Sequence, residues 1–255
     1  MPSLFDLSGK TALITGSSRG IGKAIAERMA EHGARVVISS RKEGPCQEVA
    51  DAINARYGAG RAIAVPANIS SKEELQRLVN ETNRAFGQID ALVCNAASNP
   101  YYGPMADISD DQFRKILENN IVANNWLISM VAPQMRARKD GSIIIVSSIG
   151  GLRGSPIIGA YCISKAADMQ LARNLAVEYG PDNVRVNCIA PGLIKTDFAK
   201  ALWDNPETLK KSTANAPLRR IGEPDEIAGC AVFLASRAGA FTTGQNFVID
   251  GGVTI

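Results

Sequence analysis

Short apolar runs alternate with longer segments of helical period along the 255-residue chain. The runs are rich in β-branched residues and show no polar alternation, which is typical of strands whose two faces are both covered. They predict strands at residues 11–15, 35–39, 62–66, 91–94, 142–148, 184–190 and 246–250.

Apolar residues three and four positions apart predict helices between these strands. Helices are expected at residues 20–32 and 44–57, from near Ser71, from near Ser109, up to about Gly180, and from Pro224. Glu74, three residues after Ser71, predicts a capping box at that helix start. Since strand and helix alternate throughout, the pattern predicts an α/β fold: a doubly wound parallel sheet (Rossmann fold) with helices on both faces.

Domain organisation follows from the absence of repeats, low-complexity tracts and linkers rich in Pro, Gly or Ser. We therefore expect one domain over residues 1–255. The stretch from 192 to 222 is polar and less regular than the rest. Within it, residues 195–220 are expected to form an insertion over one edge of the sheet.

Composition excludes several function classes. Hydrophobic residues make up 45% and charged residues 21%, with a net charge of +3 and no basic block, so neither a nucleic acid nor a membrane is expected as a partner. Five isolated cysteines without a CxxC pair argue against a metal site and favour a reducing compartment. The first residues lack a signal-peptide pattern and "GGVTI" is no peroxisomal signal, so a cytoplasmic location is expected.

A glycine-rich turn, "TGSSRGIG" (residues 15–22), joins the first predicted strand to the first helix. Gly16 permits a sharp turn, Gly20 permits close approach of a phosphate, and Gly22 permits close packing of the helix on the sheet. The N-terminus of the helix offers free N–H groups and a positive dipole to an anion. This context predicts a dinucleotide site.

The end of the second strand, "SSRK", bears on the choice of cofactor. Dinucleotide sites that bind NAD carry an acid about twenty residues after the turn, where it accepts the ribose 2′-hydroxyl. Ser40 stands at that place, with Arg41 and Lys42 next to it and Arg19 in the turn. Positive charge without a carboxylate suits a 2′-phosphate, so NADP is expected and NAD is the less favoured alternative.

Proton transfer is the expected role of Tyr161 and Lys165, which lie four residues apart on one predicted helix face. A cationic Lys165 favours the phenolate form of Tyr161, which could then act as general acid or base on a carbonyl or alcohol. Ser148, at the end of a strand, could hydrogen-bond the same oxygen. A surface pair on a helix is the alternative interpretation of the Tyr–Lys spacing alone.

Taken together, the stretches from "GKTALITGSSRGIG" to "TGQNFVIDGG" resemble the short-chain dehydrogenase/reductase family, single-domain type. The resemblance implies a catalytic tetrad of Asn120, Ser148, Tyr161 and Lys165. Asn119 is the alternative for the asparagine. The resemblance also implies that Asn120 anchors a water leading to Lys165, and that Lys165 holds the nicotinamide ribose.

Cofactor contacts are implied in the same way. The expected residues are Gly16, Ser18, Arg19, Gly20, Ile21, Gly22, Ser40, Arg41, Lys42, Asn68, Ile69, Asn95, Ala96, Ala97, Tyr161, Lys165, Pro191, Gly192, Ile194 and Thr196. Two positions depart from the family pattern. Ala97 stands where glycine is frequent, and Asn68 stands where an aspartate often meets the adenine.

The leading hypothesis is an NADP-dependent oxidoreductase that moves a hydride between nicotinamide and a carbonyl or secondary alcohol of a hydrophobic small molecule. Within the family, the chain is most similar to carbonyl and retinal reductases of the dehydrogenase/reductase member 4 type. A 3-oxoacyl carrier-protein reductase, a sugar dehydrogenase and a non-catalytic dinucleotide-binding regulator are the alternatives. The pocket is expected from residues 99–104, 150–158 and 198–212, and the resemblance implies a homotetramer.

Overall fold

The computed structural model describes residues 3–255 and contains a seven-stranded sheet within them. Its strands are β1 (Thr11–Thr15), β2 (Arg35–Ser39), β3 (Ala62–Ala64), β4 (Ala91–Cys94), β5 (Gly141–Val146), β6 (Val184–Pro191) and β7 (Asn246–Ile249). The spatial order is β3-β2-β1-β4-β5-β6-β7, and every neighbouring pair is parallel. The predicted doubly wound parallel sheet is confirmed.

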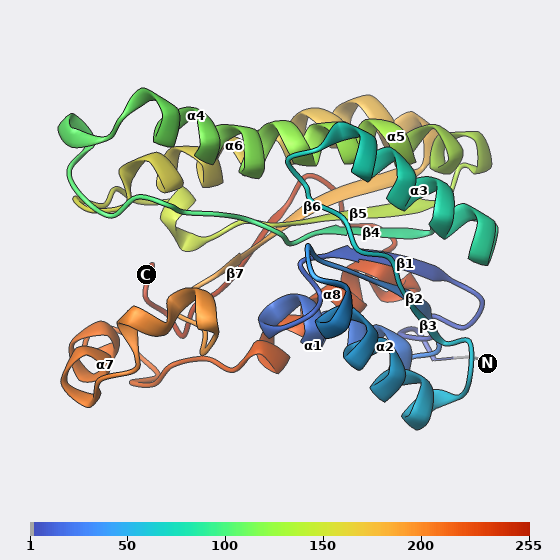
Figure 1. The fold of residues 1–255 in the computed structure, drawn as a ribbon, viewed down its shortest axis with the longest axis horizontal. Coiled ribbons are helices and arrows are strands. Elements are labelled where there is room, and N and C mark those ends of the chain that lie inside the picture. Colours follow the sequence, from blue (N-terminus) through green and yellow to red (C-terminus); the bar gives the residue numbers. More distant parts are fainter. Residues whose placement is uncertain (1–2) are drawn as a thin grey trace.

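Helices form a layer on each face of the sheet (Figure 1). They are α1 (Gly20–Glu31), α2 (Glu43–Tyr57), α3 (Lys72–Phe86), α4 (Asp110–Leu117), α5 (Ala123–Arg138), α6 (Gly159–Tyr179), α7 (Pro206–Thr213) and α8 (Pro224–Ala235). In Figure 1, α3, α5 and α6 lie over one face and α1, α2 and α8 over the other. Among residues 3–255, no helix is both long and apolar enough to cross a membrane.

Neighbouring residues on a strand enter opposite halves of the core. Leu13 and Ile14 of β1 are both fully buried. Leu13 belongs to the cluster under α3, α5 and α6, whereas Ile14 belongs to the cluster under α1, α2 and α8. Because each face of the sheet is covered, both must be apolar, which explains the strands without polar alternation.

The order in which successive strands are added to the sheet reverses after β3. From β1 the chain builds outward to β3, and then it returns to add β4 on the other side of β1. The loops that follow β1 and β4 therefore part at the carboxyl edge, where ligands of doubly wound sheets bind. This edge carries the glycine-rich turn and Asn95.

Two predicted strands end two residues earlier than expected, and the irregular stretch contains regular elements. β5 ends at Val146, so Ser148 lies beyond the strand, where its Oγ accepts the Gly150 N–H at 3.0 Å. β3 ends at Ala64, before Pro66, which has no N–H to donate to a ladder. The irregular stretch from 192 to 222 contains α7 and a 3₁₀ turn at Asp197–Leu202.

The predicted capping box at Ser71 forms only in part. Ser71 Oγ accepts the Glu74 N–H at 3.2 Å, as expected. The Glu74 carboxylate, however, accepts the Asn68 N–H at 2.9 Å instead of the Ser71 N–H. The Glu74 carboxylate thus binds the loop before α3 and does not complete the capping box.

The turn between β1 and α1 is packed without spare room. A Cβ at Gly22 would lie 2.4 Å from the Gly16 carbonyl oxygen and 2.5 Å from Asn95 Nδ2. Gly16 itself has φ +66°, in the left-handed region that glycine enters without strain. These two glycines let α1 begin directly against the end of β1.

Substituting Gly22→Ala is expected to lower the free energy of unfolding by about 1–3 kcal/mol, since the added methyl overpacks a backbone contact. Urea denaturation measures this change. Gly229→Ala in α8, where a Cβ would meet nothing within 4 Å, is the matched control. It should be neutral or stabilise by up to about 1 kcal/mol. Equal destabilisation by both substitutions would contradict the packing described here.

Candidate active site

The start of α1 fits a dinucleotide pyrophosphate. Arg19 lies at the N-cap and its side chain forms no capping hydrogen bond. The first backbone N–H groups of the helix are therefore not capped by this side chain and can bind an anion. Gly20 has φ +56°, and a Cβ there would lie 3.2 Å from the Thr196 methyl group. A ligand phosphate could therefore approach the backbone at the turn where a side chain would block it.

The segment after β4 is tied to this turn. Asn95 Nδ2 donates to the carbonyl oxygens of Thr15 at 2.9 Å and Gly16 at 3.1 Å. The Thr15 hydroxyl accepts the N–H groups of Asn95 and Ala96, each at 3.1 Å. Asn95 thus supports the shape of the turn, and Ala96 and Ala97 follow it as half-buried residues.

Ser17 is a structural residue of the turn that sequence reasoning did not single out. Its hydroxyl donates to the Ile14 carbonyl at 2.7 Å and accepts the Ser39 N–H at 2.9 Å. The side chain is fully buried. This bond fastens the glycine turn to the end of β2, where the cofactor-selecting residues were expected. The position of Ser17 inside the glycine motif was the signal that could have found it.

Two basic residues, Arg41 and Lys42, follow the end of β2. Arg41 and Lys42 are exposed, and neither forms an ion pair with another residue of the described range 3–255. The half-buried Ser40 has its hydroxyl 3.1 Å from Cys46 Sγ. Arg19 points elsewhere, because its guanidinium lies 3.2 Å from the Asp197 carboxylate.

Asn68 and Ile69 follow β3 at the same edge of the sheet. Asn68 Oδ1 accepts the Ser70 N–H at 3.1 Å, so part of this amide already stabilises its own loop. Ile69 is half-buried against the core cluster under α3, α5 and α6.

The segment after β6 reaches back to the glycine turn. Pro191 ends the strand, and Gly192 has no room for a side chain, because a Cβ would lie 2.7 Å from Asp250 Cα. Ile194 is buried, whereas Thr196 lies against Gly20. The Thr196 carbonyl accepts the Trp203 Nε1–H at 2.9 Å.

Tyr161 and Lys165 occupy the first turns of α6. The Lys165 ammonium lies 5.6 Å from the centre of the Tyr161 ring, a cation–π distance. Burial raises the pKa of the Tyr161 phenol, and the Lys165 charge and the Ser148 hydroxyl act against that rise. The predicted effect of Lys165 is present, but burial outweighs it and the net pKa is raised.

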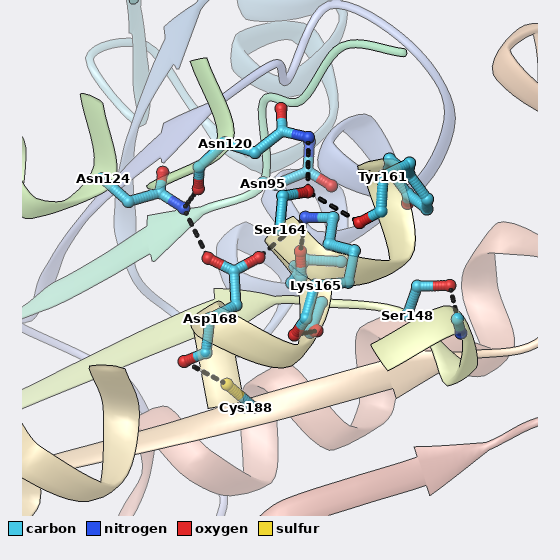
Figure 2. A network of polar contacts seen from close by, with 12 residues as sticks. Asn95, Asn120, Asn124, Ser148, Tyr161, Ser164, Lys165, Asp168 and Cys188 are labelled. Carbon is cyan, nitrogen blue, oxygen red and sulfur yellow. Dashed lines mark hydrogen bonds and ion pairs between the residues drawn. The ribbon is translucent and has the colours of Figure 1, made fainter. Parts of the chain in front are cut away.

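Lys165 is buried and has two protein partners. Its Nζ donates to the Val146 carbonyl at 3.0 Å and to Asp168 Oδ2 at 2.9 Å (Figure 2). Burial alone would lower the pKa of Lys165, but the Asp168 charge reverses this and the pKa is raised. Sequence reasoning missed Asp168. Its charge within the otherwise apolar run after Lys165 was the available signal.

The two candidate asparagines point to different neighbours. Asn120 is fully buried, and its Nδ2 donates to Ser164 Oγ of α6 at 3.0 Å and to the Ser98 carbonyl at 3.0 Å. Asn119 instead bonds the hydroxyls of Ser70 and Ser98. Of the two, Asn120 is the side chain that contacts the helix of Tyr161 and Lys165.

A π-helical turn places these asparagines. Residues Glu118–Val122 form it between α4 and α5, and the Ala123 N–H bonds the Glu118 carbonyl. One extra residue in the turn rotates the helix, and such insertions are frequent at functional sites. The sequence pattern predicted one long helix here and gave no sign of the insertion.

Comparison with known proteins agrees with this geometry. The family model described as Enoyl-(Acyl carrier protein) reductase matches residues 16–254. Dehydrogenase/reductase SDR family member 4 of Bos taurus is 41% identical over 247 residues, covering 96% of this chain and 88% of the relative. The sequence resemblance to that sub-family is confirmed.

Solved structures of the same fold are also similar. A 7α-hydroxysteroid dehydrogenase in complex with NADH and 7-oxo glycochenodeoxycholic acid is 37% identical, with a TM-score of 0.92, over 97% of this chain and 95% of that one. A candidate NAD(P)-dependent gluconate 5-dehydrogenase from Beutenbergia cavernae, with NADP bound at low occupancy, is 35% identical, with a TM-score of 0.92, over 98% and 99%.

These matches span nearly the whole chain and include the glycine turn and the Tyr161–Lys165 helix. The chain belongs to the short-chain dehydrogenase/reductase family of oxidoreductases.

Proposed function

We propose that this protein is an NADP-dependent oxidoreductase that reduces the carbonyl group of a bulky hydrophobic molecule or oxidises the matching alcohol. The observation that carries the proposal is the buried Lys165 ammonium 5.6 Å from the Tyr161 ring at the carboxyl edge of the sheet. The nicotinamide, when bound, supplies or accepts the hydride.

The residues of the chain then handle the proton. Tyr161 donates its hydroxyl proton to the carbonyl oxygen during reduction, and the Ser148 hydroxyl donates a hydrogen bond to the same oxygen. The positive charge of Lys165 stabilises the phenolate left on Tyr161. We assign the fourth tetrad position to Asn120, whose amide contacts α6 through Ser164.

The cofactor would lie along the carboxyl edge of the sheet. The α1 N-terminus and the turn residues Gly16, Ser18, Gly20, Ile21 and Gly22 would hold the pyrophosphate, with Asn68, Ile69 and residues 95–97 toward the adenosine. Arg41 and Lys42 are exposed cations at the end of β2 and suit a 2′-phosphate. The Arg19 guanidinium would join them by leaving its exposed partner Asp197, since exposed ion pairs contribute little stability.

Exposed apolar side chains, one of which lies beside Tyr161, favour a hydrophobic substrate. The ring centres of Phe198 and Tyr161 are 6.0 Å apart, and Phe198 is 50% exposed. Leu152 and Ile157 are also exposed, and the Gly103 N–H bonds the Ile157 carbonyl at 2.9 Å. We propose that residues 195–220 form the substrate loop, with Phe198 on the side that faces the substrate.

Two of the alternative functions use the same hydride transfer on another substrate, and the third has no catalytic activity. A carrier-protein reductase would need a free basic patch, for which Lys210, Lys211, Arg219 and Arg220 were candidates. Arg220 already forms ion pairs with Glu226, at 2.6 Å for the shortest contact, which weakens that case. A sugar dehydrogenase would favour a more polar lining than Phe198 and Leu202. A non-catalytic regulator would not need the intact tetrad.

The proposal also includes the oligomeric state. We propose a homotetramer, in keeping with the family resemblance. Large apolar side chains such as Val177 on α6 and Phe241 before β7 are 81% and fully exposed in the single chain. An interface that buried them would remove apolar surface from water.

Substituting Tyr161→Phe should lower kcat/KM by about 10²–10⁴-fold, the usual contribution of general acid catalysis. The assay follows NADPH absorbance with diketones, aromatic ketones, retinal, a ketose and an acetoacetyl thioester. Tyr179→Phe, on the same helix but at its far end, is the control and should retain wild-type activity. An active Tyr161→Phe enzyme would exclude this role for the hydroxyl.

Substituting Arg41→Ala should raise the KM for NADPH about tenfold and leave the KM for NADH nearly unchanged, because only NADPH carries the 2′-phosphate. Steady-state kinetics with both cofactors measures the two values. Arg84→Ala, which removes an exposed arginine of α3, should change neither. Equal effects of Arg41→Ala on both cofactors would contradict the proposed specificity.

A further inference from the structure

Lys165 is paired with a carboxylate inside the protein. The Lys165 side chain is 2% exposed and the Asp168 side chain is 0% exposed, with 2.9 Å between Nζ and Oδ2. Two charges removed from water are costly unless they are paired and hydrogen-bonded. A helix that only had to pack against β6 would need an apolar residue here, so the carboxylate requires another explanation.

Asp168 is in turn held by α5. Its Oδ1 accepts a hydrogen bond from Asn124 Nδ2 at 3.1 Å, and the same amide donates to the Asn120 carbonyl at 2.7 Å (Figure 2). Asn124 is also buried. Both oxygens of the carboxylate therefore have donors, and its orientation toward Lys165 is fixed from a second helix.

The network returns to Tyr161 through polar groups. Asn120 Nδ2 donates to Ser164 Oγ, and that hydroxyl donates to the Tyr161 carbonyl at 2.7 Å. Asp168, Asn124 and Asn120 thus connect the π turn with the part of α6 that carries the tetrad. A change at Asp168 can act on Tyr161 only through Lys165 and through the electric field, because no atom of Asp168 bonds Tyr161 among the described contacts.

We propose that Asp168, oriented by Asn124, is a positioning residue. It anchors the Lys165 ammonium near Tyr161 and balances its charge, so that Tyr161 stays protonated across the pH range in which a carbonyl is reduced. This inference rests on the proposed function and deepens it, since it assigns to Asp168 the protonated state of Tyr161 that donates to a carbonyl.

The charges around Tyr161 support this assignment. With Asp168 present, loss of a proton from the group formed by Asp168, Lys165 and Tyr161 takes its net charge from 0 to −1. Without that carboxylate, the same loss takes the charge from +1 to 0, which burial favours. The other titratable groups that face Asp168 are the thiols of Cys94 on β4 and Cys188 on β6. Burial raises the pKa of both thiols, and they remain neutral.

Asp168→Asn tests the proposal, since it removes the charge and keeps the shape. The alkaline fall of kcat/KM for carbonyl reduction should move to lower pH by about one unit, at the low end of the pKa shifts that nearby charges produce. Asp168→Ser removes the same charge with a smaller side chain and should move the profile in the same direction. Two folded variants with the wild-type pH profile would overturn the proposal.

Asp90→Asn is the matched control. Asp90 is a second buried carboxylate, which accepts the Thr11 N–H at 2.8 Å at the amino end of the sheet, away from Tyr161. Its substitution should lower stability and leave the pH profile in place. A purely structural role for Asp168 would give the same result as this control.

A readout without substrate separates this inference from the proposed function. Ultraviolet absorbance follows phenolate formation, and the difference between wild type and Tyr161→Phe isolates Tyr161. That titration should shift to lower pH in Asp168→Asn, and an unchanged titration would reject the role of Asp168. A wild type that reduces none of the carbonyls would count against the proposed function alone.

Discussion

Covering both faces of a parallel sheet leaves only its ends free for chemistry, and this constraint organises the molecule. The helices on each side make every strand apolar on both faces. The order of strand addition then reverses between β1 and β4. The loops that follow these two strands therefore run in opposite directions at the carboxyl edge and, in folds of this kind, leave a crevice for a ligand. The glycine turn, Asn95 and Ser148 follow strands that end at this edge, and the first turns of α6 bring Tyr161 beside them.

Burial beside that edge changes what charged groups can do. The Tyr161 phenol is less acidic because it is removed from water, and the nearby ammonium opposes this effect. Asp168, which lies one turn further along α6, raises the pKa of the ammonium against the effect of burial. The balance between desolvation and paired charge therefore sets the proton chemistry of the site. It also explains why a carboxylate is tolerated on an otherwise buried helix face.

Loop segments lie beside Tyr161 at the carboxyl edge of the sheet. The 3₁₀ turn Asp197–Leu202 brings Phe198 near the Tyr161 ring, and the Gly103–Ile157 contact joins two further loops. Their exposed apolar side chains would suit the hydrophobic substrate that we propose. Helix α6 thus holds Tyr161 and Lys165, while the loops around them would contact the substrate that we propose.

The sequence by itself determined the α/β class, the parallel sheet and most strand and helix positions. Apolar runs of strands covered on both faces and the helical spacing of apolar residues are both local patterns. The sequence also determined the glycine turn and the Tyr161–Lys165 pair, whose spacing is short. Only the tertiary structure decided that Ser148 lies beyond β5, that the Glu74 carboxylate caps Asn68, and that Asn120 contacts α6. The Asp168–Asn124 contact joins residues 44 positions apart, and such pairs arise from helix packing that no local pattern encodes.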